Sequence, residues 1–428
     1  MTNPMIGYAG MTHLGLNSAA AAADRGFEVI CYDADTLLVT ALDHGELPVT
    51  EPDLPELLQK NTHRIKFTAE AHALIACDLV YIAMDVSTDD YGLSDLEPII
   101  ELINLMDALL RPATVMVILS QVPPGFTRAL LSPGRLLHYQ VETLIFGRAV
   151  ERACFPERYI VGCADPGEPL PPALAHFLGS FGCPILPMRY ESAELAKISI
   201  NMCLVASVSV ANTLAEICER IGADWAEIVP ALRLDRRIGQ YAYLSPGLGI
   251  SGGNLERDLA TVLRVADQHT TDGGVVSAFV ANSRHRKDWA WAMLNELVLR
   301  GNPAARIAVW GLTYKENTNS LKNSQSIALI EKLINHDVTA FDPKAAVDAA
   351  RPNVKRAEST LAAADNADVL LILTPWPEFR AITADDLAER MRCRIVIDPY
   401  GVLNGKALIA QGFTYATLGV PAHRVGST

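Results

Sequence analysis

The chain has 428 residues, of which 50% are hydrophobic and 20% charged, a balance that predicts a globular protein of two or three domains. A formal net charge of −13 disfavours a surface that follows the phosphates of nucleic acid. Eight cysteines without C-x-x-C spacing indicate reduced thiols, not a disulfide framework or a zinc site, so we expect a cytoplasmic protein without a bound metal. The N-terminal residues lack the pattern of an export signal, which agrees with that location.

The chain begins with the pattern of a strand, a helix and a second strand. MIGYAG (5–10) predicts the first strand, and the alanine-rich LNSAAAAADRG (16–26) predicts a helix that Gly26 closes. FEVICYD (27–33) predicts the second strand. Together they predict a βαβ unit.

The turn before this helix carries the first chemical signal. Gly10 and Gly15 have the spacing of the first and third glycines of G-x-G-x-x-G, which permit a tight turn and close packing of helix on strand. Thr12 stands where a missing side chain normally lets a pyrophosphate approach the backbone, so a simple tight turn stays an open alternative. Asp33, at the end of the second strand, can accept hydrogen bonds from a ribose diol and would repel a 2′-phosphate. We therefore expect a site for NAD and not NADP.

Further apolar runs of strand length divide the rest of the chain. They are LVYIAM (79–84), TVMVIL (114–119) and RYIVG (158–162), then RIAVWG (306–311), VTAFD (338–342), VLLILT (369–374) and RIVID (394–398). Long helical patterns fill the section between the two groups. The pattern predicts an α/β fold, in which doubly wound domains at 1–188 and 301–428 flank a helical section at 189–300. We expect a parallel sheet in the first domain.

The helical section opens with an apolar stretch that has polar residues on one side. Residues 198–217 are apolar enough for a membrane span, but Asn201, Asn212 and an acidic flank favour a buried central helix. Glu194, Lys197 and Asn201 fall at i, i+3 and i+7, so they share one helical face. Lys197 is either a solvated surface charge or, because it follows the first α/β domain, a residue beneath a substrate cleft.

Seven stretches resemble the UDP-glucose/GDP-mannose dehydrogenase family, in the family's order along almost the whole chain. They are LDHGELPVTEPDLPELL, VERACFPERYIVG, ESAELAKISIN, DRRIGQYAYLSPGLGISGGNLERD, GLTYKENTNSLKNS, ADVLLILTPWPEF and IVIDPYGVLN. The resemblance implies two Rossmann-like domains, the first for NAD and the last for the nucleotide diphosphate of a nucleotide sugar. It also implies a long central helix used for homodimerisation, and a two-stage oxidation of a sugar C6 alcohol to a carboxylate.

The resemblance also assigns roles to single residues. Lys197 and Asn201 match the lysine and asparagine that hydrogen-bond the reacting oxygen, and Asp258 matches the aspartate that closes the catalytic loop. Glu142 falls where the family has the glutamate of its N-P-E-F-L segment, although the surrounding residues differ. Arg237 matches an arginine that reaches substrate across the dimer interface.

Further matches and departures concern the substrate and cofactor segments. Lys315 matches a lysine near the substrate. Five departures from the family pattern are Asn254 for the nucleophilic cysteine, Gln121 for the threonine of S-T-V-P, Val86-Ser87 for Thr-Pro, Arg257 for a lysine, and Tyr400 for an arginine. Val86 and Gln121 belong to segments expected to bind the cofactor.

The loop before Asn254 is rich in glycine. Gly247, Gly249, Gly252 and Gly253 either form a flexible connection or let backbone N–H groups approach an oxyanion or substrate closely, and we favour the second interpretation.

Replacement of the cysteine by Asn254 changes the expected chemistry. The first oxidation needs no thiol, whereas an amide cannot add to an aldehyde as a thiolate does. We therefore expect an NAD-dependent oxidoreductase that stops at the carbonyl or passes through it. Three alternatives remain: a full dehydrogenase that yields a uronic acid, a redox-neutral epimerase or dehydratase that retains NAD, and a non-catalytic binding protein.

Overall fold

The computed structural model describes residues 3–89, 92–251, 253–345 and 354–425, and it divides into two compact units. Unit 1 comprises Met1–Ile200 and unit 2 comprises Asn201–Thr428. The boundary lies within α8 (Tyr190–Ile221), a continuous helix of 32 residues.

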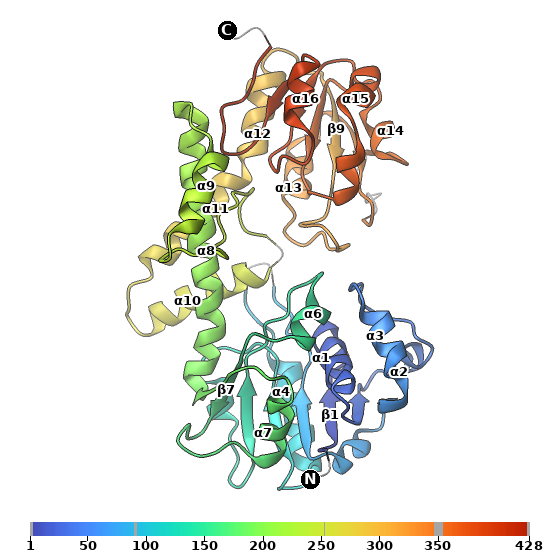
Figure 1. The fold of residues 1–428 in the computed structure, drawn as a ribbon, viewed down its shortest axis with the longest axis vertical. Coiled ribbons are helices and arrows are strands. Elements are labelled where there is room, and N and C mark those ends of the chain that lie inside the picture. Colours follow the sequence, from blue (N-terminus) through green and yellow to red (C-terminus); the bar gives the residue numbers. More distant parts are fainter. Residues whose placement is uncertain (1–2, 90–91, 252, 346–353, 426–428) are drawn as a thin grey trace. The chain divides into compact units, whose positions relative to one another are not determined.

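Unit 1 is built on an eight-stranded sheet with the strand order β3-β2-β1-β4-β5-β6-β7-β8 (Figure 1). Its strands are β1 (Ile6–Ala9), β2 (Val29–Tyr32), β3 (Ile65–Thr68), β4 (Leu79–Ile82), β5 (Val115–Ile118), β6 (Leu137–Gln140), β7 (Tyr159–Cys163) and β8 (Ile185–Arg189). All neighbouring strands are parallel except β6 and β7, which pair antiparallel. The predicted α/β fold is confirmed, but the prediction of a wholly parallel sheet is wrong at β7.

Helices cover both faces of this sheet. They are α1 (His13–Asp24), α2 (Thr36–Asp43), α3 (Leu54–Lys60), α4 (Glu97–Leu109), α5 (Phe126–Ala129), α6 (Ala149–Cys154), α7 (Pro172–Gly179) and the start of α8, with short 3-10 turns η1 (Thr62–Arg64) and η2 (Ala71–Ala76). Side chains of α1 and α7 belong to one apolar cluster, and those of α4 and the start of α8 belong to the cluster on the other face.

Alternation along the strands explains this two-sided core. In β4, Leu79 and Tyr81 join the cluster that contains α1, while Val80 and Ile82 join the opposite cluster. A strand apolar on both faces is typical of a parallel sheet between helical layers. The buried alanines of α1, from Ala19 to Ala23, allow that helix to lie close to the strands.

Unit 2 contains a six-stranded parallel sheet with the order β11-β10-β9-β12-β13-β14. Its strands are β9 (Arg306–Trp310), β10 (Asp337–Phe341), β11 (Val354–Arg356), β12 (Val369–Ile372), β13 (Ile395–Ile397) and β14 (Thr414–Ala416). In both sheets the strand order reverses beside the first strand, between β1 and β4 and between β9 and β12. Ligands of doubly wound folds bind at the carboxyl ends of the strands at such a reversal.

The helices of unit 2 fall into two groups along the chain. Before the sheet come the rest of α8, α9 (Trp225–Leu234), α10 (Asn254–Gln268), α11 (Gly274–Lys287), α12 (Trp289–Leu294) and the π-helical turn η3 (Asn295–Leu299). Between the strands come α13 (Gln325–Lys332), α14 (Thr360–Ala364), η4 (Pro377–Ala381), α15 (Ala384–Arg390) and α16 (Gly405–Ala410).

The long helix α8 is less buried than the sequence suggested. Its most apolar window passes the length and composition test for a membrane span, yet only 33% of that window is buried, which corrects the expectation of a buried central helix. Four apolar residues at intervals of four, three and four leave a stripe exposed in the single chain: Val210, Leu214, Ile217 and Ile221. A core helix of a soluble protein passes the same test, so this composition alone does not indicate a membrane protein.

Candidate active site

The first turn of unit 1 has the backbone that a dinucleotide needs. Gly10 directly follows β1 and has φ +100°, and a Cβ on it would lie 2.7–2.9 Å from atoms of Met84. A Cβ on Gly15 would lie 1.9 Å from the carbonyl oxygen of Gly10. Both positions therefore require glycine, Gly10 for its conformation and Gly15 for the close approach of α1 to the turn.

Thr12 stands at the second glycine position of the motif, and its hydroxyl makes two hydrogen bonds to backbone groups. Its Oγ1 donates to the carbonyl oxygen of Ala83 at 3.3 Å and accepts from the backbone N–H of Asp85 at 3.1 Å. The hydroxyl thus ties the first turn to the segment after β4. This contact accounts for a side chain at Thr12 in a turn that still has the two essential glycines.

Asp33, predicted to bind a ribose, lies directly after β2 and faces the same turn. Its Oδ2 accepts the N–H of Met11 at 2.8 Å, and its Oδ1 accepts the N–H of Asp35 at 3.0 Å. A carboxylate has two acceptor sites on each oxygen, so these bonds leave capacity for a ribose diol.

Val86 and Gln121 follow the neighbouring strands β4 and β5, at the same carboxyl edge as Gly10 and Asp33. Ser120 joins their segments, because its hydroxyl donates to the carbonyl oxygen of Met84 at 2.6 Å. The fold therefore brings the residues predicted to bind the cofactor to one edge of the sheet.

Lys197 and Glu142 form a partly buried ion pair in unit 1. The Lys197 Nζ lies 3.5 Å from the Glu142 Oε2, and the two side chains are only 12% and 17% exposed. The backbone N–H of Leu144 donates to the other oxygen of Glu142. Burial raises the pKa of the Glu142 carboxyl, and the charge of Lys197 opposes that rise. This pairing places Glu142 beside the predicted catalytic lysine, a contact that the sequence segment alone did not show.

Glu194, predicted to share a helical face with Lys197, bonds to a different segment of unit 1. It is completely buried, and it accepts the backbone N–H groups of Gly125 at 2.6 Å and Thr127 at 2.8 Å. Burial raises the pKa of Glu194, whereas these hydrogen bonds lower it. Its carboxylate anchors the segment after Gln121 and does not stand free beside Lys197.

Two of the catalytic residues predicted in unit 2, Asn201 and Asp258, are in contact. The Asn201 Nδ2 of α8 donates to the Asp258 Oδ2 of α10 at 2.5 Å, and the Arg257 Nε lies 3.4 Å from the Asp258 Oδ1. Asp258 is 1% exposed and Arg257 is 7% exposed. Since α8 is continuous and four residues make about one turn, Lys197 and Asn201 lie on the same side of that helix.

Asn254, in the position expected for a nucleophile, is the first residue of α10 and is exposed. Gly253 before it has φ +100°, and the Lys322 side chain passes beside this glycine, with its Cε 3.4 Å from a Cβ placed there. A helix N-terminus with a nearby ammonium favours negative charge on a bound group. Asn254 adds an amide donor there but no nucleophile.

Side chains of α11, of the first residue of α13 and of the segment before α13 hold the chain around Asn254. The Gln325 Nε2 donates to the Ser251 Oγ at 2.9 Å, and Glu256 contacts both the Lys287 Nζ at 2.9 Å and the Asn323 Nδ2 at 2.5 Å. The loop is therefore anchored on both sides of Asn254, which favours a defined site over a flexible connection.

Gly249, predicted to bind substrate, has a packing reason to be glycine. It has φ +81°, and a Cβ on it would lie 2.5 Å from the carbonyl oxygen of Ser283. Gly252 of the same loop lies outside the described residues. A substrate contact of Gly249 stays a prediction.

All eight cysteines are described, and none of them forms a disulfide. Within unit 2, Cys203 is exposed on α8 two residues after Asn201, so it points about 200° around the helix from it. Cys218 belongs to a buried cluster with Trp225, and Cys393 lies 3.2 Å from the Asp368 Oδ1. Burial raises the pKa of the described thiols of unit 1, which keeps them protonated: Cys31, Cys77, Cys154, Cys163 and Cys183.

Unit 2 also contains the predicted substrate residues Arg237 and Lys315, and Tyr400, which departs from the family pattern. Arg237 is paired with Asp235 at 2.6 Å, and its side chain is 89% exposed. Lys315 lies after β9, with its Nζ 5.7 Å from the centre of the Tyr314 ring. Tyr400 is partly buried against the core of the sheet, and burial raises the pKa of its hydroxyl. Substrate contacts of Arg237 and Lys315 stay predictions.

Comparisons with known proteins agree with this arrangement over the whole chain. Three models of the UDP-glucose/GDP-mannose dehydrogenase family match in order: the NAD binding domain over residues 5–168, the central domain over 191–284 and the UDP binding domain over 308–405. The UDP-glucose 6-dehydrogenase of Pseudomonas aeruginosa is 30% identical over 441 residues, with 96% of each chain covered. The chain belongs to the UDP-glucose/GDP-mannose dehydrogenase family.

Solved structures show the same architecture. A UDP-glucose dehydrogenase from Pyrobaculum islandicum has a TM-score of 0.82 at 25% identity, and the match covers 95% of this chain and 98% of that one. A UDP-D-ManNAc dehydrogenase from Pyrococcus horikoshii has a TM-score of 0.83 at 21% identity, and the match covers 97% and 99% of the two chains. Both Rossmann-like domains and the central helix of the prediction are thus confirmed.

Family membership confirms the predicted class and cofactor. The family comprises NAD-dependent oxidoreductases that act on a CH–OH group of nucleotide sugars, and NAD is the cofactor of this chain. The residues fit that group: the required glycines at Gly10 and Gly15 and the carboxylate of Asp33 supply a turn, a close approach and a ribose acceptor.

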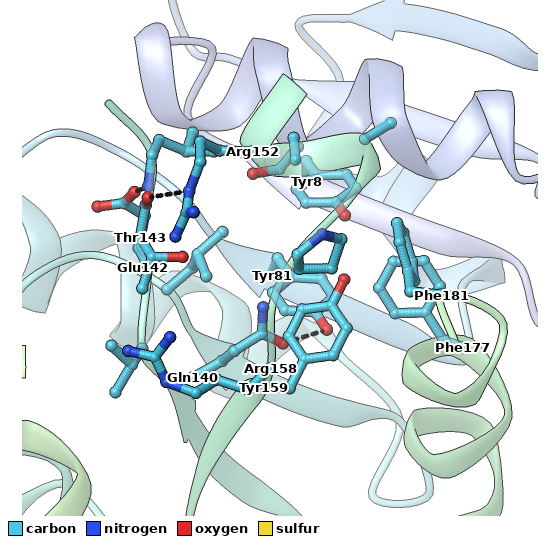
Figure 2. Close-up of a pocket in the computed structure, with 17 residues that line it drawn as sticks. Tyr8, Tyr81, Gln140, Glu142, Thr143, Arg152, Arg158, Tyr159, Phe177 and Phe181 are labelled. Atoms are coloured by element: carbon cyan, nitrogen blue, oxygen red, sulfur yellow. Dashed lines mark hydrogen bonds between the residues drawn. The ribbon is translucent and has the colours of Figure 1, made fainter. Parts of the chain in front are cut away.

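A cavity in unit 1 lies apart from these cofactor residues. Figure 2 shows Gln140, Tyr81, Tyr8 and Tyr159 around it, with the Tyr81 hydroxyl donating to the Gln140 Oε1 at 2.9 Å. Its volume of about 50 Å³ has room for a few water molecules and not for a dinucleotide. Glu142 lines one side of the cavity.

Two buried contacts near the site escaped the sequence analysis. Glu194 was recognised by its spacing, but nothing in that spacing identifies Gly125 and Thr127 as its partners. His13 lies within the glycine-rich turn and Glu51 within LDHGELPVTEPDLPELL, and their side chains meet at 2.9 Å. The sequence signal for this contact was only that His13 and Glu51 each lie in a segment that carries a motif.

Proposed function

We propose that the protein oxidises a hydroxyl of a nucleotide sugar, with C6 of a UDP-sugar or a related NDP-sugar as the first candidate. We further propose that the reaction stops at the carbonyl or passes through it without a covalent adduct. The single observation that carries the second part is the amide of Asn254 at the start of α10, where the family resemblance places a nucleophilic cysteine. Matching relatives named UDP-glucose 6-dehydrogenase support the first part.

The first oxidation uses the groups that the chain retains. The sugar carbon loses a hydride and its hydroxyl loses a proton, which leaves one C=O, one NADH and one proton for each NAD consumed. NAD, when bound, supplies the hydride acceptor. Lys197 and Asn201 polarise the reacting oxygen, and Asp258 orients the Asn201 amide by accepting its N–H. Glu142 is partly buried beside Lys197 and can hold the released proton.

Oxidation of the carbonyl to an acid needs an oxygen added to its carbon. A thiolate adds to the carbonyl carbon, the adduct loses hydride to give a thioester, and water then supplies the oxygen by hydrolysis and releases the thiol. An amide is not a nucleophile near neutral pH and cannot begin this sequence. Asn254 at the N-terminus of α10 can donate a hydrogen bond to the carbonyl oxygen and so hold the product. We therefore expect release of an aldehyde or ketone, or of its hydrate.

Complete oxidation through the hydrate is the second candidate. A hydrated aldehyde carries the required oxygen already and can lose a second hydride without a thiol. Glu142 favours this route, because its partly buried carboxyl can take a proton from a hydroxyl of the hydrate. Such a reaction would be slow compared with the first step.

A panel of UDP-, GDP-, CDP- and TDP-sugars with NAD tests the proposal. NADH is followed by absorbance and products by mass spectrometry, for the wild type, Asn254→Ala and Asn254→Cys. We expect a carbonyl product from the wild type, first-step activity in Asn254→Ala within about threefold, and a gain of carboxylate in Asn254→Cys. Turnover without net NADH would show redox-neutral chemistry, and nucleotide-sugar binding without turnover would show a non-catalytic protein.

We also propose a cytoplasmic homodimer that uses α8, with domains at 1–188, 189–300 and 301–428. The stripe of Val210, Leu214, Ile217 and Ile221 supports this, since each is at least 40% exposed in the single chain. Light scattering after size exclusion tests it: a dimer is expected, and Leu214→Glu together with Ile217→Glu should give a monomer. A wild-type monomer at micromolar concentration would refute it.

A further inference from the structure

His13, the first residue of α1, is held from two sides in unit 1. Its side chain is buried, and its Nε2 lies 2.9 Å from the Glu51 Oε2. The Phe146 ring stacks on the imidazole at 4.0 Å between ring centres and 25° between planes. An ionised carboxylate only accepts hydrogen bonds, so His13 donates to Glu51 from Nε2.

Glu51 is also buried, and both of its oxygens are used. Its Oε2 also accepts the backbone N–H of Gly147 at 3.0 Å, and its Oε1 accepts the N–H of Ala149 at 2.8 Å. Glu51 comes before α3, whereas Gly147 and Ala149 lie between β6 and the first turn of α6. One carboxylate thus joins three segments that are distant in the sequence.

The segment fastened in this way is the one that begins with Glu142. Residues 142–149 start just after β6 and end at Ala149, the first residue of α6. The first of them, Glu142, has its Oε2 3.5 Å from the Lys197 Nζ. Phe146, which stacks on His13, belongs to the same segment. Its far end is therefore bonded to Glu51, and through Glu51 to the turn that contains Gly10 and Gly15.

We propose that His13 is a positioning residue that couples the cofactor turn to residues 142–149, and so keeps Glu142 beside Lys197 when NAD is bound. The coupling rests on NAD binding at the first turn, and its catalytic consequence rests on the proposed function of Glu142. The contacts carry the argument: removal of the His13 donor leaves Glu51 with two backbone N–H groups and without its hydrogen bond to α1.

Hydrogen exchange tests the coupling without any need for turnover. In the wild type, we expect NAD to slow exchange of the Gly147 and Ala149 amides at least about threefold, because ordering of the turn is transmitted through Glu51. His13→Phe retains an aromatic ring but no donor, and should lose this effect. His13→Gln places a donor near the same position and should restore it.

Two controls separate coupling from loss of fold. His72→Phe changes an exposed histidine of η2 in the same unit and should behave as the wild type. Peptides of unit 2 should exchange alike in all variants. Equal NAD-dependent slowing at Gly147 and Ala149 in the wild type and His13→Phe would overturn the proposal, as would its absence from the wild type when NAD is bound.

A kinetic cycle with Glu142→Gln tests the catalytic consequence. His13→Phe should lower kcat about tenfold in the wild-type background, because small displacements of a catalytic group are costly, but by less than about twofold in Glu142→Gln. A purely structural effect of His13→Phe would lower kcat by the same factor in both backgrounds, and this result would contradict the proposal. If no nucleotide sugar is turned over, the proposed function fails, and hydrogen exchange alone decides the coupling.

Discussion

Replacement of Asp258 by asparagine tests the polar centre of unit 2, since it changes charge and hydrogen bonding but not size. The carboxylate is 1% exposed and lies 2.5 Å from the Asn201 Nδ2 and 3.4 Å from the Arg257 Nε, both of which donate. An amide presents one acceptor and one donor. Whichever way the introduced amide turns, its donor faces Asn201 or Arg257.

The expected magnitude follows from these two contacts. Loss of a hydrogen bond to a charged group costs about 1.5–3 kcal/mol, and one of the two donors would face another donor, so we expect about 3 kcal/mol of destabilisation. For a folding unit of roughly 200 residues this lowers Tm by about 6–12 °C. At 25 °C the folded variant should also lose kcat by about 100-fold, because Asn201 is no longer held.

Thermal unfolding by circular dichroism and kinetics on the best nucleotide sugar provide the assay. Asp267→Asn is the matched control, since Asp267 is an exposed aspartate of the same helix, and it should change Tm by less than about 2 °C. A Tm for Asp258→Asn within the same limit would refute the reasoning. So would unchanged kcat in a destabilised protein, because Asp258 would then stabilise without positioning.

Three further outcomes follow from other contacts. The raised pKa of Glu142 should place the acidic limb of the kcat/KM profile above the ordinary glutamate pKa of about 4.3, so that activity is lost as the pH falls through the raised pKa. Glu142→Gln should abolish that limb. A limb that persists unchanged in this variant would exclude Glu142 as the titrating group. Gly15→Ala should destabilise unit 1 by more than about 3 kcal/mol and abolish NAD binding in calorimetry, since a Cβ would lie 1.9 Å from a backbone oxygen. The control Gly179→Ala should fold normally, because the space around Gly179 is open. NAD binding by Gly15→Ala would refute this reasoning. Burial lowers the pKa of His138 to about 4, so below about pH 6.5 the unfolded chain binds a proton that the folded chain does not. Urea unfolding should show that the free energy of unfolding falls by about 2 kcal/mol between pH 7 and 5, and His138→Leu should lose correspondingly less. The same loss between pH 7 and 5 in His138→Leu would exclude His138 as its cause.

Much of unit 1 could be predicted because its signals are local. Gly10, Gly15 and Asp33 indicated the βαβ turn and NAD, and the turn has the required backbone. The direction of β7 could not be predicted, since an apolar strand such as Tyr159–Cys163 has the same pattern whether it runs parallel or antiparallel.

Contacts between distant segments were beyond the sequence. Helical periodicity placed Glu194 with Lys197, but the partners of Glu194 are backbone N–H groups more than 60 residues away. His13 and Glu51 are separated by 38 residues and share no motif that requires them to meet. The roles of Asn201 and Asp258 came from family resemblance, and the structure adds the 2.5 Å contact between them.

The number of hydrides removed from each sugar molecule tests the central claim most directly. Wild-type protein would be run to completion with excess NAD and a limiting amount of the best nucleotide sugar, with NADH counted by absorbance and the product identified by NMR. With Asn254 in place of a thiol, we predict one NADH for each sugar consumed and an aldehyde, ketone or hydrate as product. Two NADH and a carboxylate, formed without accumulation of a carbonyl species, would contradict the account.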